Sequence, residues 1–185
     1  MSHAWIGLGS NLGNREQYLK NAASELSMLG GVRFASVYET DPIFPRGVRR
    51  EAGRFLNTVC ALETGRNVLD LFTALRRIEV RNQRVTKERF APRSLDIDLL
   101  DFDRLCLVLG ESEDASMAAA APYAQLRLKL PHPRLHLRKF VLIPWCELDP
   151  LWMHPLLKRS ITQLLESVAD QSSVNLHCVA ADLFL

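Results

Sequence analysis

The order of apolar segments in the first 101 residues is the feature that most restricts the fold. Four short, mostly apolar segments are typical of strands, at residues 4–9, 32–39, 55–63 and 95–101. Two longer segments with helical spacing of apolar residues separate them, and Asn14 and Asn67 are suitable N-caps for the two helices. The order β-α-β-β-α-β is that of the split βαβ, or ferredoxin-like, fold.

The chain is therefore expected to be an α+β protein with an antiparallel sheet. We expect the two helices to pack on one face of the sheet and the other face to be open to ligands. Residues 110–122 are low in complexity and predict a surface excursion, and a C-terminal extension is expected to hold a helix at 159–169 and a strand at 174–179. No internal repeat or second boundary is visible, so we expect one domain over residues 1–185.

Charge and composition argue against several classes of protein. The net charge is +2, which gives no strong field over the whole surface for nucleic acid or a membrane. No stretch approaches the roughly 20 apolar residues of a membrane span, and the N-terminus lacks a leader pattern, so a cytoplasmic location is expected. The four cysteines lie far apart and are expected to be reduced thiols in the core: Cys60, Cys106, Cys146 and Cys178.

A glycine-rich segment, GLGSNLG at residues 7–13, lies between the first strand and the first helix. Its spacing, G-x-G-x-x-x-G, is one residue longer than the dinucleotide-binding pattern, and no parallel βαβ unit follows. No Gly-Lys-Ser/Thr follows either, so a phosphate-binding Walker loop is excluded. We interpret the segment as a turn.

Two aspartates interrupt the apolar segment 95–101. Asp96 and Asp98 lie two residues apart, so in a strand they share the face opposite the apolar side chains. Carboxylates about 6–7 Å apart on one face suit Mg²⁺, which takes one or two carboxylates together with substrate phosphates. The alternative is an ordinary solvated face, and we assign Asp101 and Asp103 to the solvated end of this strand.

A basic segment lies directly upstream of these aspartates. Residues 76–93 carry seven basic and two acidic side chains, a local excess of +5. A basic run is usually a solvated helix face. This one continues past the helix into residues 83–92, and arginine side chains bind phosphate oxygens through two nitrogens at once. Arginines beside a carboxylate pair that binds Mg²⁺ are the basic components of a phosphoryl-transfer site.

A third polar group lies at residues 130–140, LPHPRLHLRKF. His132 stands between two prolines, which restrict its backbone, and Arg134, Arg138 and Lys139 add positive charge. A single histidine is more often structural than catalytic. Phe140 ends the group, and it can either enter the core or offer a face for stacking.

Four blocks of the chain together resemble a known enzyme family. They are GLGSNLGNR (7–15), FLNTVCALET (55–64), RFAPRSLDIDLLDFD (89–103) and LPHPRLHLRKFVLIPWCELDP (130–150). In order and spacing they resemble the 6-hydroxymethyl-7,8-dihydropterin pyrophosphokinases of folate biosynthesis. The most specific element is Pro-Arg-(Ser/Thr)-Leu-Asp-hydrophobic-Asp, joined to the downstream Pro-His and Arg-x-Phe. This family transfers the β,γ-pyrophosphoryl unit of ATP to the pterin hydroxymethyl group and releases AMP.

The resemblance implies a role for each matching residue. Asp96 and Asp98 would bind two Mg²⁺, and Arg84 and Arg93 would act with them in catalysis. The implied ATP contacts are Arg76, Glu79, Arg84, Lys87, Arg89, Arg93, His132 and Arg138. The implied pterin contacts are Thr40, Asp41, Pro42, Phe55, Asn57, Asp96 and Phe140. Phe55 and Phe140 would enclose the flat pterin, and Asn57 with the backbone at 40–42 would bind its polar edge.

The chain also departs from the family pattern. Thr86 stands in place of a second arginine of the basic loop, and Phe90 stands in place of a tryptophan. A rival interpretation is a ferredoxin-like module that binds RNA or senses a small molecule. An RNA reader of this topology carries an aromatic RNP1-like strand, which residues 55–64 lack. The expected partners are therefore ATP and the dihydropterin, and the chain is expected to be a monomer.

Overall fold

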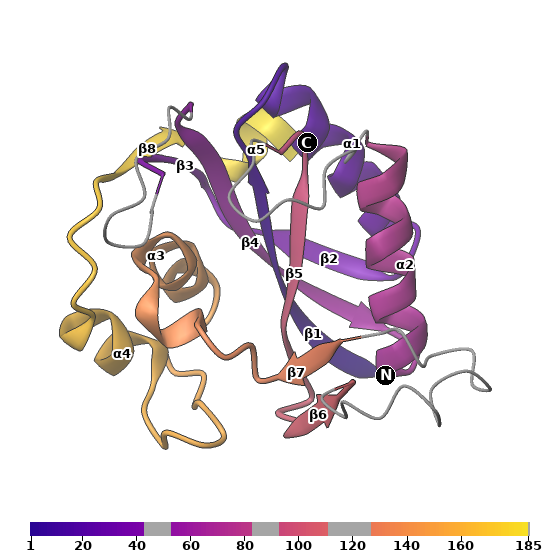
Figure 1. Cartoon of the computed structure of the whole chain (residues 1–185), viewed down its shortest axis with the longest axis vertical. Helices are drawn as coiled ribbons and strands as arrows, with labels where there is room; N and C mark the ends of the chain where they lie inside the picture. The colour runs from indigo at the N-terminus through magenta and orange to yellow at the C-terminus, as the bar shows by residue number, and fades with distance from the viewer. Residues whose placement is uncertain (43–52, 83–92, 111–126, 185) are drawn as a thin grey trace.

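A computed structural model describes residues 1–42, 53–82, 93–110 and 127–184 of the chain (Figure 1). The strands are β1 (Ser2–Ser10), β2 (Gly31–Phe34), β3 (Val37–Thr40), β4 (Phe55–Thr64), β5 (Asp96–Phe102), β6 (Leu107–Leu109), β7 (Leu128–Leu130) and β8 (Val174–Cys178). The helices are α1 (Arg15–Ser27), α2 (Val68–Arg81), the 3₁₀ turn η2 (Leu135–Leu137), α3 (Lys139–Leu148), α4 (Ile161–Ser167) and α5 (Ala180–Phe184).

The main sheet has the antiparallel topology that the sequence predicts. Its strands lie in the order β5-β1-β4-β3-β8, and β2 pairs with another part of β4. The predicted strand at 32–39 is two strands, because the register with β4 shifts by one residue between Phe34 and Tyr38. There the Ser36 N–H donates to the Glu147 carboxylate of α3, at 2.9 Å. The predicted terminal strand is confirmed as β8, which pairs with β3.

Both predicted helix starts are confirmed by their caps. The Asn14 side chain accepts the Gln17 N–H at 3.2 Å at the start of α1. The Asn67 side chain accepts the N–H groups of Leu69 and Asp70, at 3.1 and 2.9 Å, at the start of α2. These side chains satisfy main-chain donors that a helix leaves without partners at its first turn.

Helices lie on both sides of the sheet, with α1 and α2 on one side and α3 and α4 on the other (Figure 1). One apolar cluster joins α1 and α2 to a face of the sheet. A second joins the opposite face to α3 and α4 through three indoles, with the Trp5 and Trp145 rings 4.8 Å apart and the Trp145 and Trp152 rings 4.6 Å apart. The expectation of an open second face is therefore wrong where α3 and α4 cover it.

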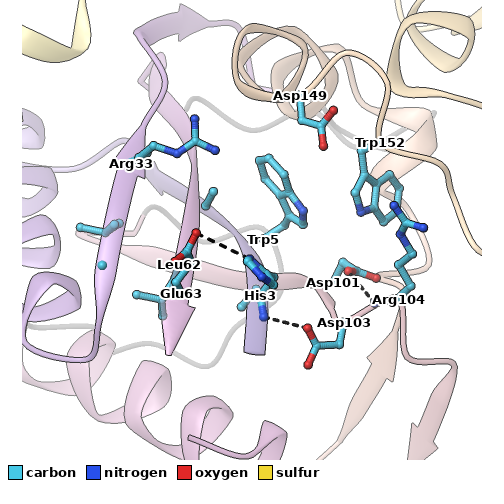
Figure 2. Close-up of a pocket in the computed structure, with 14 residues that line it drawn as sticks. His3, Trp5, Arg33, Leu62, Glu63, Asp101, Asp103, Arg104, Asp149 and Trp152 are labelled. Atoms are coloured by element: carbon cyan, nitrogen blue, oxygen red, sulfur yellow. Dashed lines mark hydrogen bonds and ion pairs between the residues drawn. The ribbon is translucent and has the colours of Figure 1, made fainter. Parts of the chain in front are cut away.

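Asp101 is buried, so its assignment to a solvated strand end is wrong. Only 1% of Asp101 is exposed. The pairing of β5 with β1 shifts register between Trp5 and Ile6, which places Asp101 opposite Trp5 of the second apolar cluster. One oxygen accepts the Arg104 N–H at 3.0 Å, and burial raises the Asp101 pKa to about 6. Asp101 lines a pocket of about 630 Å³ together with Trp5 and Trp152. Figure 2 shows how these side chains lie around the pocket. Asp103 is exposed, as expected.

The four cysteines are free, but they do not all lie in the core. Cys60 is buried, and burial raises the pKa of its thiol. Cys106 is exposed, which contradicts the prediction for this residue. Among the residues that the structure describes, no helix is both long and apolar enough to cross a membrane.

Candidate active site

The floor of the candidate site is the middle of the sheet, where β1 carries glycine. Gly7 lies opposite Asp98 of β5, and Gly9 lies between Asp96 of β5 and Asn57 of β4. Side chains directly opposite one another in an antiparallel pair share a face. A Cβ atom on Gly9 would lie 2.8 Å from the Asn57 Oδ1, closer than non-bonded atoms approach. The glycines interpreted as part of a turn therefore also leave room between the aspartates and Asn57.

The structure places a cation beside each of the two aspartates. Arg93 Nη1 lies 2.6 Å from Asp96 Oδ2. Arg138 Nη1 lies 3.5 Å and His132 Nε2 lies 4.0 Å from Asp98 Oδ2. The aspartate side chains are 24% and 34% exposed, so solvent or a ligand can reach both carboxylates. One or two residues from each of the three segments that the sequence singled out thus lie together: Arg93, Asp96, Asp98, His132 and Arg138.

Burial lowers the pKa of the two basic side chains beside Asp98, those of His132 and Arg138. It lowers the pKa of His132, which favours the neutral imidazole, and the Asp98 charge opposes this effect. The His132 Nδ1 accepts the Arg134 N–H at 3.3 Å, so the proton of the neutral ring is on Nε2, the nitrogen that faces Asp98. Burial also lowers the pKa of Arg138, whose guanidinium stays charged at neutral pH.

Arg76 and Glu79 hold the main chain between the two aspartates. Glu79 is 2% exposed, and its Oε1 accepts the Ile97 N–H at 2.8 Å. Arg76 donates to the Ile97 carbonyl and forms an ion pair with Glu79, Nη1 to Oε2 at 2.7 Å. The pair therefore replaces a neighbouring strand at this residue of β5. The implied contacts of Arg76 and Glu79 with ATP stay a prediction.

The predicted pterin residues surround the start of β4. The Asn57 Nδ2 donates to the Thr40 Oγ1 at 2.8 Å, and both side chains are buried. Phe55 is the first residue of β4, and Phe140 lies at the start of α3, which packs over β4. The Arg138 guanidinium carbon lies 5.4 Å from the centre of the Phe140 ring, so one helix start presents a cation and an aromatic face together.

Comparison with known proteins connects this geometry to a family. The model of the 7,8-dihydro-6-hydroxymethylpterin-pyrophosphokinase family matches residues 5–150. The 2-amino-4-hydroxy-6-hydroxymethyldihydropteridine pyrophosphokinase of Bacillus subtilis is 35% identical over 148 residues, which are 78% of this chain and 77% of that protein. The enzyme of the same name from Mycobacterium tuberculosis is 34% identical over 99% of this chain and 94% of its own length.

The chain belongs to this family. It transfers a pyrophosphoryl group to hydroxymethyldihydropterin in folate biosynthesis, which replaces the rival interpretation of an RNA-binding or sensory module. The HPPK-DHPS structure of Plasmodium falciparum matches 89% of this chain with a TM-score of 0.67 at 16% identity, and it supports the fold. This chain spans 45% of the length of that larger protein.

The sequence did not indicate a group of charged residues next to the predicted pterin residue Asp41: Arg15, Glu39 and Arg54. The Arg15 Nη1 lies 2.9 Å from Glu39 Oε1, and the Arg54 Nη1 lies 3.1 Å from Glu39 Oε2. Arg54 also contacts Asp41, Nε to Oδ1 at 2.9 Å, and Ser173 Oγ donates to Asp41 Oδ2 at 2.5 Å. These hydrogen bonds, from Ser173 and then Arg54, lower the pKa of Asp41. The signal was the position of Arg15, which is the last residue of the block GLGSNLGNR (7–15).

Three predicted phosphate-binding residues, Arg84, Lys87 and Arg89, lie outside the described residues, as do Thr86 and Phe90. Their roles stay predictions. Pro42 is described and partly exposed, and its contact with pterin is also untested. Within the described ranges, no group of three or more His, Cys, Asp or Glu side chains can hold a metal ion by itself.

Proposed function

We propose that ATP is the pyrophosphoryl donor and that the reaction requires Mg²⁺ held at Asp96 and Asp98. The observation that carries this proposal is the pair of carboxylates on one face of β5, each beside a cation and over a floor of glycine. In the proposed step, the pterin hydroxyl oxygen bonds to the β-phosphorus. The bond from that phosphorus to the α,β-bridging oxygen breaks, AMP leaves with the electron pair, and the hydroxyl proton passes to Asp98 or to water.

The residues present suit magnesium. Asp96 and Asp98 supply hard oxygen donors that are partly exposed, and Mg²⁺ characteristically takes one or two carboxylates and fills its other positions with water and phosphate. Among the described residues the two aspartates belong to no group of three or more His, Cys, Asp or Glu side chains, which fits that preference better than it fits a structural metal site. When bound, Mg²⁺ would neutralise charge on the transferred phosphates.

The chain's own cations are proposed to bind the rest of the triphosphate. Arg93 and Arg138 lie beside the two aspartates, where each guanidinium can donate to phosphate oxygens. The Nε2–H of His132 is proposed to donate a further hydrogen bond there. Arg84, Lys87 and Arg89 are proposed to complete the phosphate contacts, and Arg76 and Glu79 to border the nucleotide.

The pterin is proposed to lie between Phe55 and Phe140. Flat heterocycles stack well on aromatic rings, and the buried Asn57 and Thr40 would hydrogen-bond its polar edge beside the backbone of Asp41 and Pro42. This orientation directs the hydroxymethyl group toward Asp96. We further propose that the chain acts as a monomer, which sedimentation at working concentration tests.

The deciding experiment identifies the nucleotide product. With the pterin and MgATP, we expect AMP and the pterin diphosphate in equal amounts. Formation of ADP would refute pyrophosphoryl transfer from ATP. Removal of divalent cations with EDTA should abolish turnover, and added Mg²⁺ should restore it; full activity in EDTA would refute the metal requirement.

A further inference from the structure

Asn11, in the turn after β1, contacts the two regions that flank the site. It belongs to the glycine-rich block but is given no role in the proposed function. Only 7% of Asn11 is exposed. Its neighbour in the fold is Arg93, which is distant in sequence and pairs with Asp96.

Two hydrogen bonds join Asn11 to the main chain of Arg93. The Arg93 N–H donates to the Asn11 Oδ1 at 2.7 Å, and the Asn11 N–H donates to the Arg93 carbonyl at 3.0 Å. Both main-chain groups of Arg93 are therefore bound by one residue. The next residue is also held, because the Ser94 hydroxyl donates to the Asn82 carbonyl at 2.6 Å.

A third contact extends from Asn11 toward the pterin side. The Asn11 Nδ2 donates to the Gly53 carbonyl at 3.4 Å, which is a long bond. The backbone of Gly53 lies close to that of Asn11, since a Cβ atom on Gly53 would lie 3.2 Å from the Asn11 carbonyl oxygen. Gly53 is followed by Arg54, which binds Glu39 and Asp41. One amide side chain thus touches the main chain on both sides of the site.

We propose that Asn11 is a positioning residue for the reaction. It fixes the main chain of Arg93, and through it the guanidinium that meets Asp96 at 2.6 Å. The guanidinium is joined to that backbone by the Arg93 side chain and makes a short, charge-assisted contact with Asp96, so a displacement of the backbone moves the guanidinium relative to its partner. This inference rests on the proposed roles of Arg93 and Asp96.

The test compares Asn11→Ala with Asn11→Asp in the full-length chain. Alanine removes both side-chain bonds, and we expect kcat to fall about 10- to 100-fold, the cost of a misplacement near 1 Å. Aspartate keeps an acceptor for the Arg93 N–H but loses the donor to Gly53. It should therefore recover most of the lost kcat, while any rise in the pterin KM persists. If the alanine variant does not fold, Asn11→Ser replaces it, since its hydroxyl is too short to reach Arg93.

The matched control is Asn14→Ala, in the same turn. Asn14 also accepts a main-chain N–H, that of Gln17, but it is exposed and lies outside the site. We expect a lower melting temperature with unchanged kcat. Amide hydrogen exchange provides a readout besides activity: the Arg93 N–H should exchange faster in Asn11→Ala and at the wild-type rate in Asn14→Ala.

Three results would overturn the inference: kcat within twofold of wild type in Asn11→Ala, equal kcat losses in the alanine and aspartate variants, or an equal loss in Asn14→Ala. Arg93→Ala separates this failure from that of the proposed function. If Arg93→Ala is fully active, the role of Arg93 is wrong. If Arg93→Ala is inactive and Asn11→Ala is active, only the positioning role is wrong.

Discussion

The two ends of β5 place aspartates in opposite environments. Asp96 and Asp98 are partly exposed and lie beside Arg93 and Arg138. Asp101 is buried beside Trp5 and Trp152, and its Oδ1 has no hydrogen-bond partner in the described part of the chain. A ligand can reach the carboxylates of Asp96 and Asp98, whereas the buried Asp101 carboxylate destabilises the fold when it is ionised. The same residue type on one strand thus has a proposed role in the reaction at one end and weakens the fold at the other.

The largest expected effect is on activity at the exposed end. Asp98→Asn removes a charge from the proposed magnesium site while keeping the shape of the side chain. We expect kcat/KM for AMP formation to fall about 1,000-fold, because several kcal/mol of transition-state stabilisation are lost. Chemical unfolding should show little loss of stability. Turnover near the wild-type rate would show that the two ends of β5 do not differ as described.

The reciprocal change is Asp101→Asn, which should affect stability and leave turnover unchanged. The folded-state pKa of about 6 lies above the usual value of 3.8, so the protonated form stabilises the fold below pH 3.8. That contribution is lost as pH rises to about 6, and it amounts to about 3 kcal/mol. The variant should therefore gain stability over wild type between pH 4 and pH 7, measured by urea unfolding. A difference that does not vary with pH would contradict the effect of burial.

Gly9→Ala tests the floor beside the exposed aspartates. The added methyl group would meet the Asn57 Oδ1, so we expect a loss of about 1–3 kcal/mol in stability and a higher pterin KM. Gly31→Ala is the matched control, because a Cβ atom there meets nothing within 4 Å. Equal pterin KM values in the two variants would remove Gly9 from the site.

The smallest expected effect concerns the first turn of α2. Asn67→Ala removes the cap of α2 and should cost about 1 kcal/mol in the free energy of unfolding. The kcat and both KM values should not change. A clear fall in kcat would mean that a small loss of stability in α2 disturbs Asp96 and Asp98. The division of β5 into an end that affects activity and an end that affects stability would then be wrong.

Period-two alternation predicted the shared face of Asp96 and Asp98 because that part of β5 pairs regularly with β1. The assignment of Asp101 to a solvated strand end rested on its position past the site, not on alternation, and the register shift that pairs Asp101 with Trp5 leaves no mark in the sequence of β5 itself. The periodicity of apolar residues also gave no sign that α3 covers the second face, because α3 is short, mostly apolar and contains Pro144. Local periodicity identifies elements, while their packing depends on contacts between distant segments.

The proximity of the candidate site residues was predictable to the extent that they stand in short blocks of the sequence. The aspartates, Arg93 and Arg138 each stand in a segment with an unusual density of charge or proline. The supporting residues carry no such signal. Gly9 acts by lacking a side chain, and Asn11 acts by binding the backbone of a residue 82 positions away, so both were indistinguishable from ordinary turn residues.

The Arg76–Glu79 pair on Ile97 has a consequence for the behaviour of the protein in concentrated solution. β5 ends the main sheet, and unpaired N–H and C=O groups at such an edge can recruit a strand from another molecule. At Ile97 both groups are bound by α2, so a foreign strand cannot continue its ladder past this residue. The contact that holds the backbone between the two aspartates therefore also protects the enzyme against edge-to-edge aggregation.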